Sequence, residues 1–279
     1  MKKIIAFWIL IVCCVPLKAQ TKLSNVNYLE DFIDQGITLK SLTSDTLLGL
    51  PQEIFIVTID PSISSSALSL TYSDYRKKTS DQAMEQQGDI AINGSFFNMD
   101  TGEPACFLKI NDTIRGVSRY DLKPNYFLDQ LDDAAVVVTP DNLLKIIQKP
   151  SCGGWESLDQ YPDVMVSGPL LIWNKELVKL DTIPFNRNRY ARTGACTTTT
   201  GKIVFFTVDG GADQASGMTM HEFALLMESQ NCEEGINLDG GGSTTLWMKQ
   251  QKIVNHPTDN KVFDHYGERP VSSVILLKK

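Results

Sequence analysis

Short runs of β-branched and other apolar residues, separated by turn-forming residues, recur along most of the chain and constrain its fold more than any other feature. Runs of this kind predict β-strands. The clearest is Glu53–Asp60, with the sequence EIFIVTID. Phe107–Ile110 and Thr113–Val117 are separated only by Asn111-Asp112, which predicts a hairpin. Further strands are expected at Ile37–Leu42, Ile90–Ile92, Ala134–Thr139, Val164–Ile172, Lys202–Asp209, Ile236–Asp239, Thr244–Met248 and Val271–Leu277.

One segment, Thr219–Asn231, has a strong helical pattern, because its apolar residues recur at i, i+3, i+4 and i+7. These residues are Met220, Phe223, Ala224 and Met227. Shorter helices are expected at Ser80–Gln87, which Gly88 would end, and at Tyr28–Ile33. Many strands and few helices predict an α+β fold of mostly antiparallel sheets, in a single compact catalytic domain.

The N-terminus has the pattern of a secretion signal. Lys2 and Lys3 precede the uncharged apolar run Ile4–Val15, which is too short to span a bilayer as a permanent helix. We expect cleavage after Ala19 and a secreted or periplasmic product. A lipid anchor on Cys13 is disfavoured, because the preceding residue is not small. The chain is therefore divided into a signal peptide at 1–19, an N-terminal appendage at 20–50 whose pattern favours no fold, and one domain at 51–279.

Charge and composition exclude several classes of protein. The formal net charge of −7 and the lack of a basic run argue against nucleic acid as a partner. No later apolar run approaches transmembrane length, so stable membrane insertion is not expected. The cysteines beyond the signal are scattered, without metal-ligand spacing, and sequence alone leaves both free thiols and disulfides open. They are Cys106, Cys152, Cys196 and Cys232. We expect no metal and no cofactor.

The motifs of several common enzymes are missing from the sequence. It contains neither the G-x-S-x-G of a nucleophile elbow nor a P-loop. Its three histidines do not form H-E-x-x-H. Serine-dependent acyl transfer and zinc hydrolysis are therefore disfavoured.

Glycine-adjacent polar clusters lie instead at the expected strand ends. They are Asn93-Gly94-Ser95-Phe96-Phe97, Arg192-Thr193-Gly194, Val208-Asp209-Gly210, Gly217-Met218-Thr219-Met220 with Glu222, Asn237–Thr245, Asn255-His256-Pro257 and Glu268-Arg269-Pro270-Val271. With these motifs in this order, the chain resembles the phosphodiester glycosidase family from about Ala91 to Val274. Ser95 and Ala195 depart from the usual motifs, but neither occupies a charged position.

The resemblance implies a hydrolase that cleaves the C1–O bond of a sugar-1-phosphodiester or phosphoglycan and releases free sugar and a phosphate monoester. Such a leaving group has a second pKa of about 6 and departs without strong acid assistance. One carboxylate, acting as nucleophile or base, can then suffice. A non-catalytic glycan-binding protein that uses the same crevice is the alternative. A phosphodiesterase that cuts the P–O bond would typically need a metal site.

Carboxylates at the expected strand ends are the catalytic candidates. Asp239 is the first choice, because it follows an apolar strand and precedes three glycines. Asp209 is the second choice, with a turn-forming role as its alternative. Glu103 matches the family motif, which favours a role in the site, holding sugar hydroxyls, over the alternative of a solvated loop carboxylate. Asn93, with Gly94, is expected to hold sugar hydroxyls.

The glycine-rich segment and two arginines are expected to bind the phosphate. Gly240, Gly241 and Gly242 permit positive φ and can expose neighbouring N–H groups to an anion, with Ser243 and Thr244 as hydroxyl donors. A tight hairpin turn is the alternative. The guanidinium groups of Arg192 and Arg269 offer paired donors to phosphate oxygens, unless they form surface ion pairs.

Thr219 and Glu222 have the spacing of a capping box at the start of the expected helix. That structural role explains both residues. A catalytic role for Glu222 is the alternative.

Overall fold

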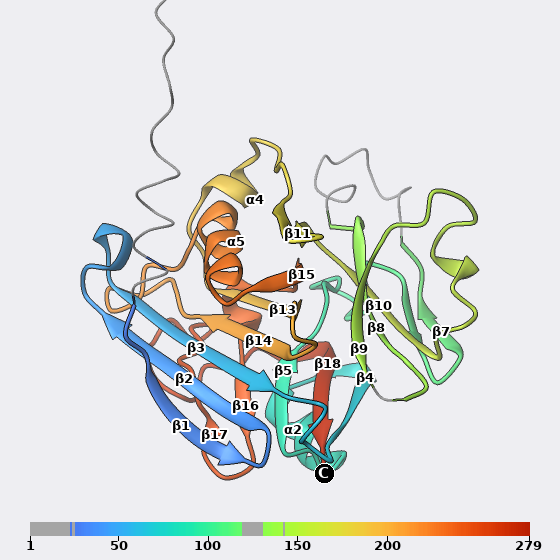
Figure 1. Ribbon diagram of the computed structural model, residues 1–279, viewed down its shortest axis with the longest axis horizontal. Coiled ribbons are helices and arrows are strands. Elements are labelled where there is room, and N and C mark those ends of the chain that lie inside the picture. The colour runs from blue at the N-terminus through green and yellow to red at the C-terminus, as the bar shows by residue number, and fades with distance from the viewer. Residues whose placement is uncertain (1–22, 24–25, 119–130, 142) are drawn as a thin grey trace, which may run out of the picture.

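The computed structural model describes residue 23 and residues 26–118, 131–141 and 143–279. The expected signal peptide lies outside the described residues. Every pairing between the named strands is antiparallel. The strands form three sheets (Figure 1).

The largest sheet contains eight strands and includes both early and late parts of the chain. In spatial order they are β1 (Leu29–Asp34), β2 (Ile37–Ser44), β3 (Gln52–Ile59), β14 (Ile203–Val208), β13 (Arg192–Thr198), β15 (Cys232–Asn237), β11 (Leu170–Trp173) and β12 (Glu176–Leu177). The residues expected to form an appendage thus supply the two strands at one edge of this sheet, and β2 pairs with β3 along its whole length.

The other two sheets contain five strands each. One has the order β7 (Thr113–Gly116), β6 (Leu108–Ile110), β10 (Asp163–Ser167), β8 (Ala134–Val138) and β9 (Leu144–Gln148). The other has the order β17 (Lys252–Ile253), β16 (Leu246–Met248), β5 (Ile90–Asn93), β18 (Val271–Lys278) and β4 (Ala67–Lys77). The predicted hairpin is present as β6 and β7, and Asn111 and Asp112 both have positive φ, as its turn requires.

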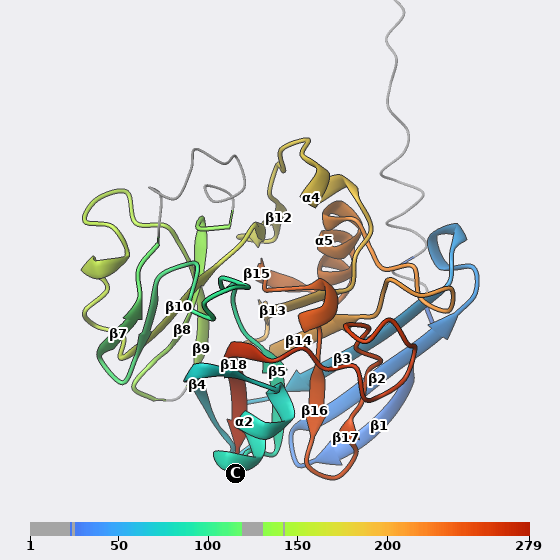
Figure 2. The same ribbon diagram turned by 180° about the vertical axis from the view of Figure 1, so that it is seen from behind.

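A single hydrophobic cluster joins the three sheets, because Phe55, Ile92 and Val136 come from different sheets and all belong to it. The α-helices among the described residues cover the outside: α2 (Thr79–Glu85), α4 (Pro184–Arg187) and α5 (Met220–Ser229). Helix α5 packs on the large sheet over β11 and β15, whereas α2 lies against β5 and β18 (Figure 2). No helix among the described residues is long and apolar enough to cross a membrane.

The expected helix at Tyr28–Ile33 is wrong, because residues 29–34 form strand β1. Its backbone pairs with β2 after a tight turn at Gly36, which has a φ of 75°. Leu29 and Phe32 are exposed on this edge strand, whereas Tyr28 and Ile33 pack against core clusters.

The strand expected at Val164–Ile172 is divided between two sheets. Strand β10 ends at Ser167, and β11 begins at Leu170 in the large sheet. Pro169 separates them, and a proline has no N–H to continue a ladder of hydrogen bonds. The continuous apolar run predicts one strand, but within it the chain passes from one sheet to another.

A disulfide joins Cys196 of β13 to Cys232 of β15. Cys106 is a buried free thiol and Cys152 an exposed one. The bridge links two neighbouring strands of the large sheet, and Cys232 is the first residue of β15, at the end away from the glycine-rich loop.

We predict that replacing both Cys196 and Cys232 by Ser lowers the free energy of unfolding by about 2–4 kcal/mol, because the bridge closes a long loop in the unfolded chain. Their separation in sequence is 36 residues. Urea denaturation measures the change, and Cys152→Ser is the matched control that should leave stability unchanged. Equal stability of the double variant and the control would contradict a formed bridge.

Candidate active site

The ends of strands from two sheets meet at one point of the structure. Strand β5 ends at Asn93, whose Nδ2 donates a hydrogen bond to the carbonyl of Asp239 (2.7 Å). The amide of Asp239 donates in turn to the carbonyl of Gly94 (3.1 Å), and the amide of Leu238 donates to that of Thr193 (2.8 Å). The clusters that surround Asn93, Thr193 and Asp239 in the sequence are therefore neighbours in space.

The glycine-rich loop that follows β15 is a 3₁₀ turn from Gly241 to Ser243. It is neither an open anion nest nor a hairpin turn, because most of its amides already have partners in the protein. Gly240 N donates to the Asp239 carboxylate (2.9 Å) and Gly241 N to the Ala191 carbonyl (2.8 Å), while the amides of Ser243 and Thr244 close the turn itself.

Close packing explains two of the glycines in this loop. A Cβ on Gly240 would lie 2.6 Å from the carbonyl oxygen of Ala191, and one on Gly242 would lie 2.6 Å from Nη2 of Arg269. The glycines bring the loop against β13 on one side and against Arg269 on the other.

The Asp239 carboxylate is half-buried at the start of this loop. Desolvation raises its pKa to about 6, against the opposing effects of the Ser243 hydroxyl, the charge of Arg269 and the Gly240 amide. A carboxyl group that titrates near neutral pH suits proton transfer under physiological conditions.

Arg269 precedes β18 and lies against the glycine-rich loop at Gly242. Its Nε and Nη2 both contact Oδ1 of Asp259, at 2.8 Å and 2.6 Å. The Arg269 side chain is 25% exposed, and it forms an ion pair, the alternative that the sequence analysis gave to phosphate binding. Asp259 was not singled out by the sequence analysis, because its spacing from Arg269 matches no recognised motif.

Arg192 does not occupy the phosphate-binding position that the sequence analysis expected. Its guanidinium is buried and donates through Nε to the carbonyl of Met218 (2.9 Å) and through Nη2 to those of Phe185 and Asn188 (2.9 Å each). Burial lowers its pKa only to about 10, so it remains charged at neutral pH. The group ties the start of β13 to the α4 region.

Asn93 is engaged within the protein, whereas Glu103 lies on the surface. Asn93 is buried, and its Oδ1 accepts hydrogen bonds from the Thr193 hydroxyl (2.8 Å) and the Thr245 amide (3.0 Å). Its amide is thus engaged at both ends within the protein. Glu103 is exposed on the loop that follows Asn98, where its Oε2 accepts from the Thr101 hydroxyl (3.4 Å).

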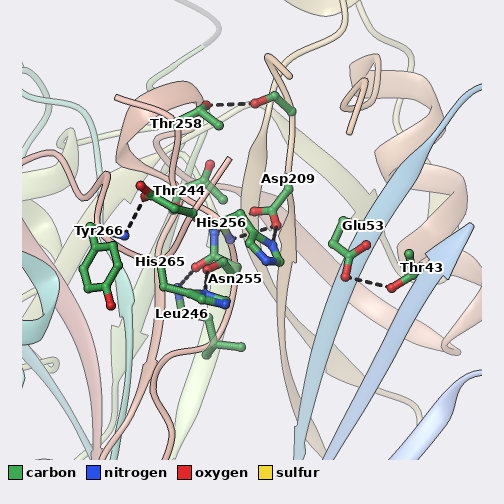
Figure 3. A network of polar contacts seen from close by, with 12 residues as sticks. Thr43, Glu53, Asp209, Thr244, Leu246, Asn255, His256, Thr258, His265 and Tyr266 are labelled. Carbon is green, nitrogen blue, oxygen red and sulfur yellow. Dashed lines mark hydrogen bonds and ion pairs between the residues drawn. The ribbon is translucent and has the colours of Figure 1, made fainter. Parts of the chain in front are cut away.

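Asp209, the second catalytic candidate, is 1% exposed at the end of β14. Its carboxylate accepts hydrogen bonds from Asn255 Nδ2 (2.8 Å), the His256 amide (2.9 Å) and His256 Nδ1 (3.0 Å) (Figure 3). The sequence analysis placed Asn255 and His256 in a polar cluster but gave them no role. These contacts place Asp209 inside the protein rather than at an open surface.

The predicted capping box at α5 is present. Thr219 Oγ1 accepts from the Glu222 amide (3.2 Å), and Glu222 Oε2 accepts from the Thr219 amide (2.9 Å). Oε1 of Glu222 pairs with Arg189, a residue that the sequence analysis did not single out. The described residues contain no group of three or more His, Cys, Asp or Glu side chains placed to hold a metal ion.

Comparison with known proteins agrees with the motifs gathered at this point. The family model for phosphodiester glycosidases matches residues 86–278. The chain belongs to the phosphodiester glycosidase family, which confirms the resemblance found in the sequence.

The individual relatives share little sequence identity with this chain. The N-acetylglucosamine-1-phosphodiester alpha-N-acetylglucosaminidase of Mus musculus is 26% identical over 199 residues, which is 66% of this chain and only 36% of the mouse protein. The solved catalytic domain of the zebrafish protein of that name has a TM-score of 0.66 at 18% identity and covers 91% of this chain and 89% of its own. A crystal structure from Synechocystis has a TM-score of 0.62 at 16% identity, covering 88% and 64%. The zebrafish and Synechocystis structures thus have the same fold as this chain.

We predict that Glu222→Gln retains activity and lowers the free energy of unfolding by a few tenths to about 1 kcal/mol, because the amide keeps the reciprocal cap and loses only the charge that pairs with Arg189. Denaturation and turnover of the same preparation measure both effects. Thr219→Ala, which removes the other half of the box, is the control and should cost about 1 kcal/mol. A folded but inactive Glu222→Gln variant would show that the carboxylate has a catalytic role.

Proposed function

We propose that the protein is an exported hydrolase that cleaves the C1–O bond of a sugar-1-phosphodiester and releases the free sugar and a phosphate monoester. The observation that carries the proposal is that a partly buried carboxylate, Asp239, lies within electrostatic reach of a partly exposed guanidinium, Arg269, beside the glycine-rich loop. The family membership supports the reaction class. The mouse relative's name describes action on N-acetylglucosamine-1-phosphodiester, which supports a related substrate for this chain.

Export is supported by two independent features. The first is the charged and apolar pattern of residues 2–15, which is typical of a secretion signal. The second is the Cys196–Cys232 disulfide, since such bridges persist mainly in oxidising compartments. We place the enzyme outside the cytoplasm, secreted or in a periplasm.

The roles of the two charged groups follow from the leaving group. As the C1–O bond breaks, its electron pair stays with the phosphate oxygen, and the Arg269 guanidinium neutralises the negative charge that develops there. Asp239 acts at C1 in its ionised form, either by taking the proton of an attacking water or by bonding to the carbon before water hydrolyses the intermediate. The atoms of one water molecule end on the sugar and the phosphate monoester.

Turnover of a small panel of substrates tests this function. The wild-type protein should hydrolyse sugar-1-phosphodiesters much faster than alkyl glycosides of the same sugars. Binding of these compounds without any hydrolysis would favour a glycan-binding protein instead.

We predict that Asp239→Asn lowers kcat on the order of 10²–10⁴-fold without unfolding the protein, because the amide can serve neither as base nor as nucleophile. The wild-type rate should fall as the pH drops through about 6, since the carboxyl group becomes protonated there. Steady-state kinetics across pH measures both effects, and circular dichroism checks the fold of the variant. Near-normal turnover by folded Asp239→Asn would exclude Asp239 as the reactive group.

We predict that Arg269→Ala lowers kcat/KM on the order of 10²–10³-fold for phosphodiester substrates, because its contribution grows as charge develops on the leaving group. Arg269→Lys should lose less and still be impaired, because lysine keeps the charge but not the two-pronged donor geometry. A sugar with an uncharged leaving group is the control substrate, and its hydrolysis should change little. Equal losses on both substrates would mean that Arg269 is structural and does not contact the phosphate.

A further inference from the structure

The segment Asn255-His256-Pro257, between β17 and β18, has no part in the reaction proposed above, yet its side chains are packed into the site. Asn255 is buried, and its Nδ2 donates hydrogen bonds to Asp209 Oδ1 (2.8 Å) and to the carbonyl of Thr244 (3.0 Å). Its Oδ1 accepts from the amide of Leu246 (2.7 Å) (Figure 3). One side chain thus holds the backbone on both sides of Thr245.

Asp209 fixes the orientation of that amide. Its carboxylate needs donors, so it selects the Nδ2 end of Asn255 and leaves Oδ1 for the Leu246 amide. The remaining acceptor positions are used by the backbone amide and the Nδ1 atom of His256. A rotated Asn255 amide would place oxygen against carboxylate, which is strongly unfavourable in a buried site.

His256 completes this series of contacts, because its Nδ1 lies 3.0 Å from the buried Asp209 carboxylate. Its ring stacks on Phe263, with centroids 4.1 Å apart, and lies 4.4 Å from the ring of His265. Asp209, Glu53 and Asp264 are the carboxylates that act on it. Burial lowers the pKa of His256, but the bond to Asp209 and the charges of the three carboxylates outweigh this effect and leave the pKa above its ordinary value.

The other end of this series of hydrogen bonds reaches the backbone of Asp239. The amide of Thr245 donates to Asn93 Oδ1 (3.0 Å), and Asn93 Nδ2 donates to the carbonyl of Asp239 (2.7 Å). Asn93 and Asn255 therefore hold residues 244–246 from opposite sides. Both side chains are buried, so their contacts are not shared with bulk solvent.

We propose that His256 is a positioning residue of this enzyme: acting through Asp209 and Asn255, its Nδ1 donor fixes the backbone of residues 244–246, and through Asn93 it fixes the placement of Asp239. The proposal rests on the proposed function in taking Asp239 as the reactive carboxylate. Catalysis depends on such placement, because a misplacement of about 1 Å can cost about 10²-fold in rate.

Two substitutions of His256 distinguish the effect of its Nδ1 hydrogen-bond donor from that of its aromatic ring. His256→Phe keeps an aromatic ring for Phe263 but has no donor for Asp209, and we expect kcat to fall about 10- to 100-fold with KM changed less than about threefold. His256→Asn places an amide donor close to the position of Nδ1, and we expect it to recover kcat to within about threefold of wild type. His221→Phe, on the exposed surface of α5, is the matched control and should leave kcat unchanged.

A second readout does not depend on the reaction. Hydrogen–deuterium exchange of the peptide that covers residues 240–248 reports on the Thr245 and Leu246 amides. We expect faster exchange there in His256→Phe, near wild-type exchange in His256→Asn, and no change across α5 in either. Asn255→Asp tests the same series of contacts at its centre. It keeps the side-chain volume but replaces the donor that faces Asp209 by a carboxylate. We expect it to lower kcat and to speed exchange at residues 240–248, and it provides the test even if His256→Phe does not fold.

The outcomes distinguish this inference from the proposed function. If wild-type protein hydrolyses no sugar-1-phosphodiester, the function is wrong, and the exchange data still test the chain of contacts. If the enzyme is active and His256→Phe keeps both its kcat and its exchange pattern, His256 does not position the loop. A loss of kcat with unchanged exchange at residues 240–248, or equal losses in the Asn and Phe variants, would also overturn the inference.

Discussion

The buried side-chain amide of Asn93 is the contact on which the site depends. Strand β5 belongs to one sheet and β13 to another, and this amide joins them by accepting from Thr193 and Thr245 and donating to the carbonyl of Asp239. A buried amide is costly unless its partners are present, so it strongly disfavours any other arrangement of these strand ends. The placement of Asp239 is thereby tied to the packing of the two sheets.

The charged side chains around this contact differ in how deeply they are buried and in how they are engaged by the protein. Asp209 and Arg192 are each 1% exposed and engaged by the protein itself. Glu222 caps α5 and pairs with Arg189. Asp239 and Arg269 are partly buried beside the glycine-rich loop, and Arg269 is also paired with Asp259. We infer that the chemistry belongs to Asp239 and Arg269.

Local pattern in the sequence predicted much of the fold, including α5 with its capping box and the hairpin of β6 and β7. It failed at β1, where pairing with β2 overrides a weak helical pattern, and near Pro169, where an apolar run continues across two sheets. The motifs predicted which segments converge. They did not predict the partners of Arg192, because these are backbone carbonyls that no residue type marks, or that of Asp209, because Asn255 lies 46 residues further along the chain.

The central claim is that the enzyme breaks the bond between the anomeric carbon and oxygen, so that phosphate departs rather than being attacked. Hydrolysis in ¹⁸O-labelled water, followed by mass spectrometry of both products, tests it most directly. We predict that the label appears in the released sugar and not in the phosphate monoester. Label in the phosphate would mean cleavage of the P–O bond, and would contradict the roles given to Asp239 and Arg269.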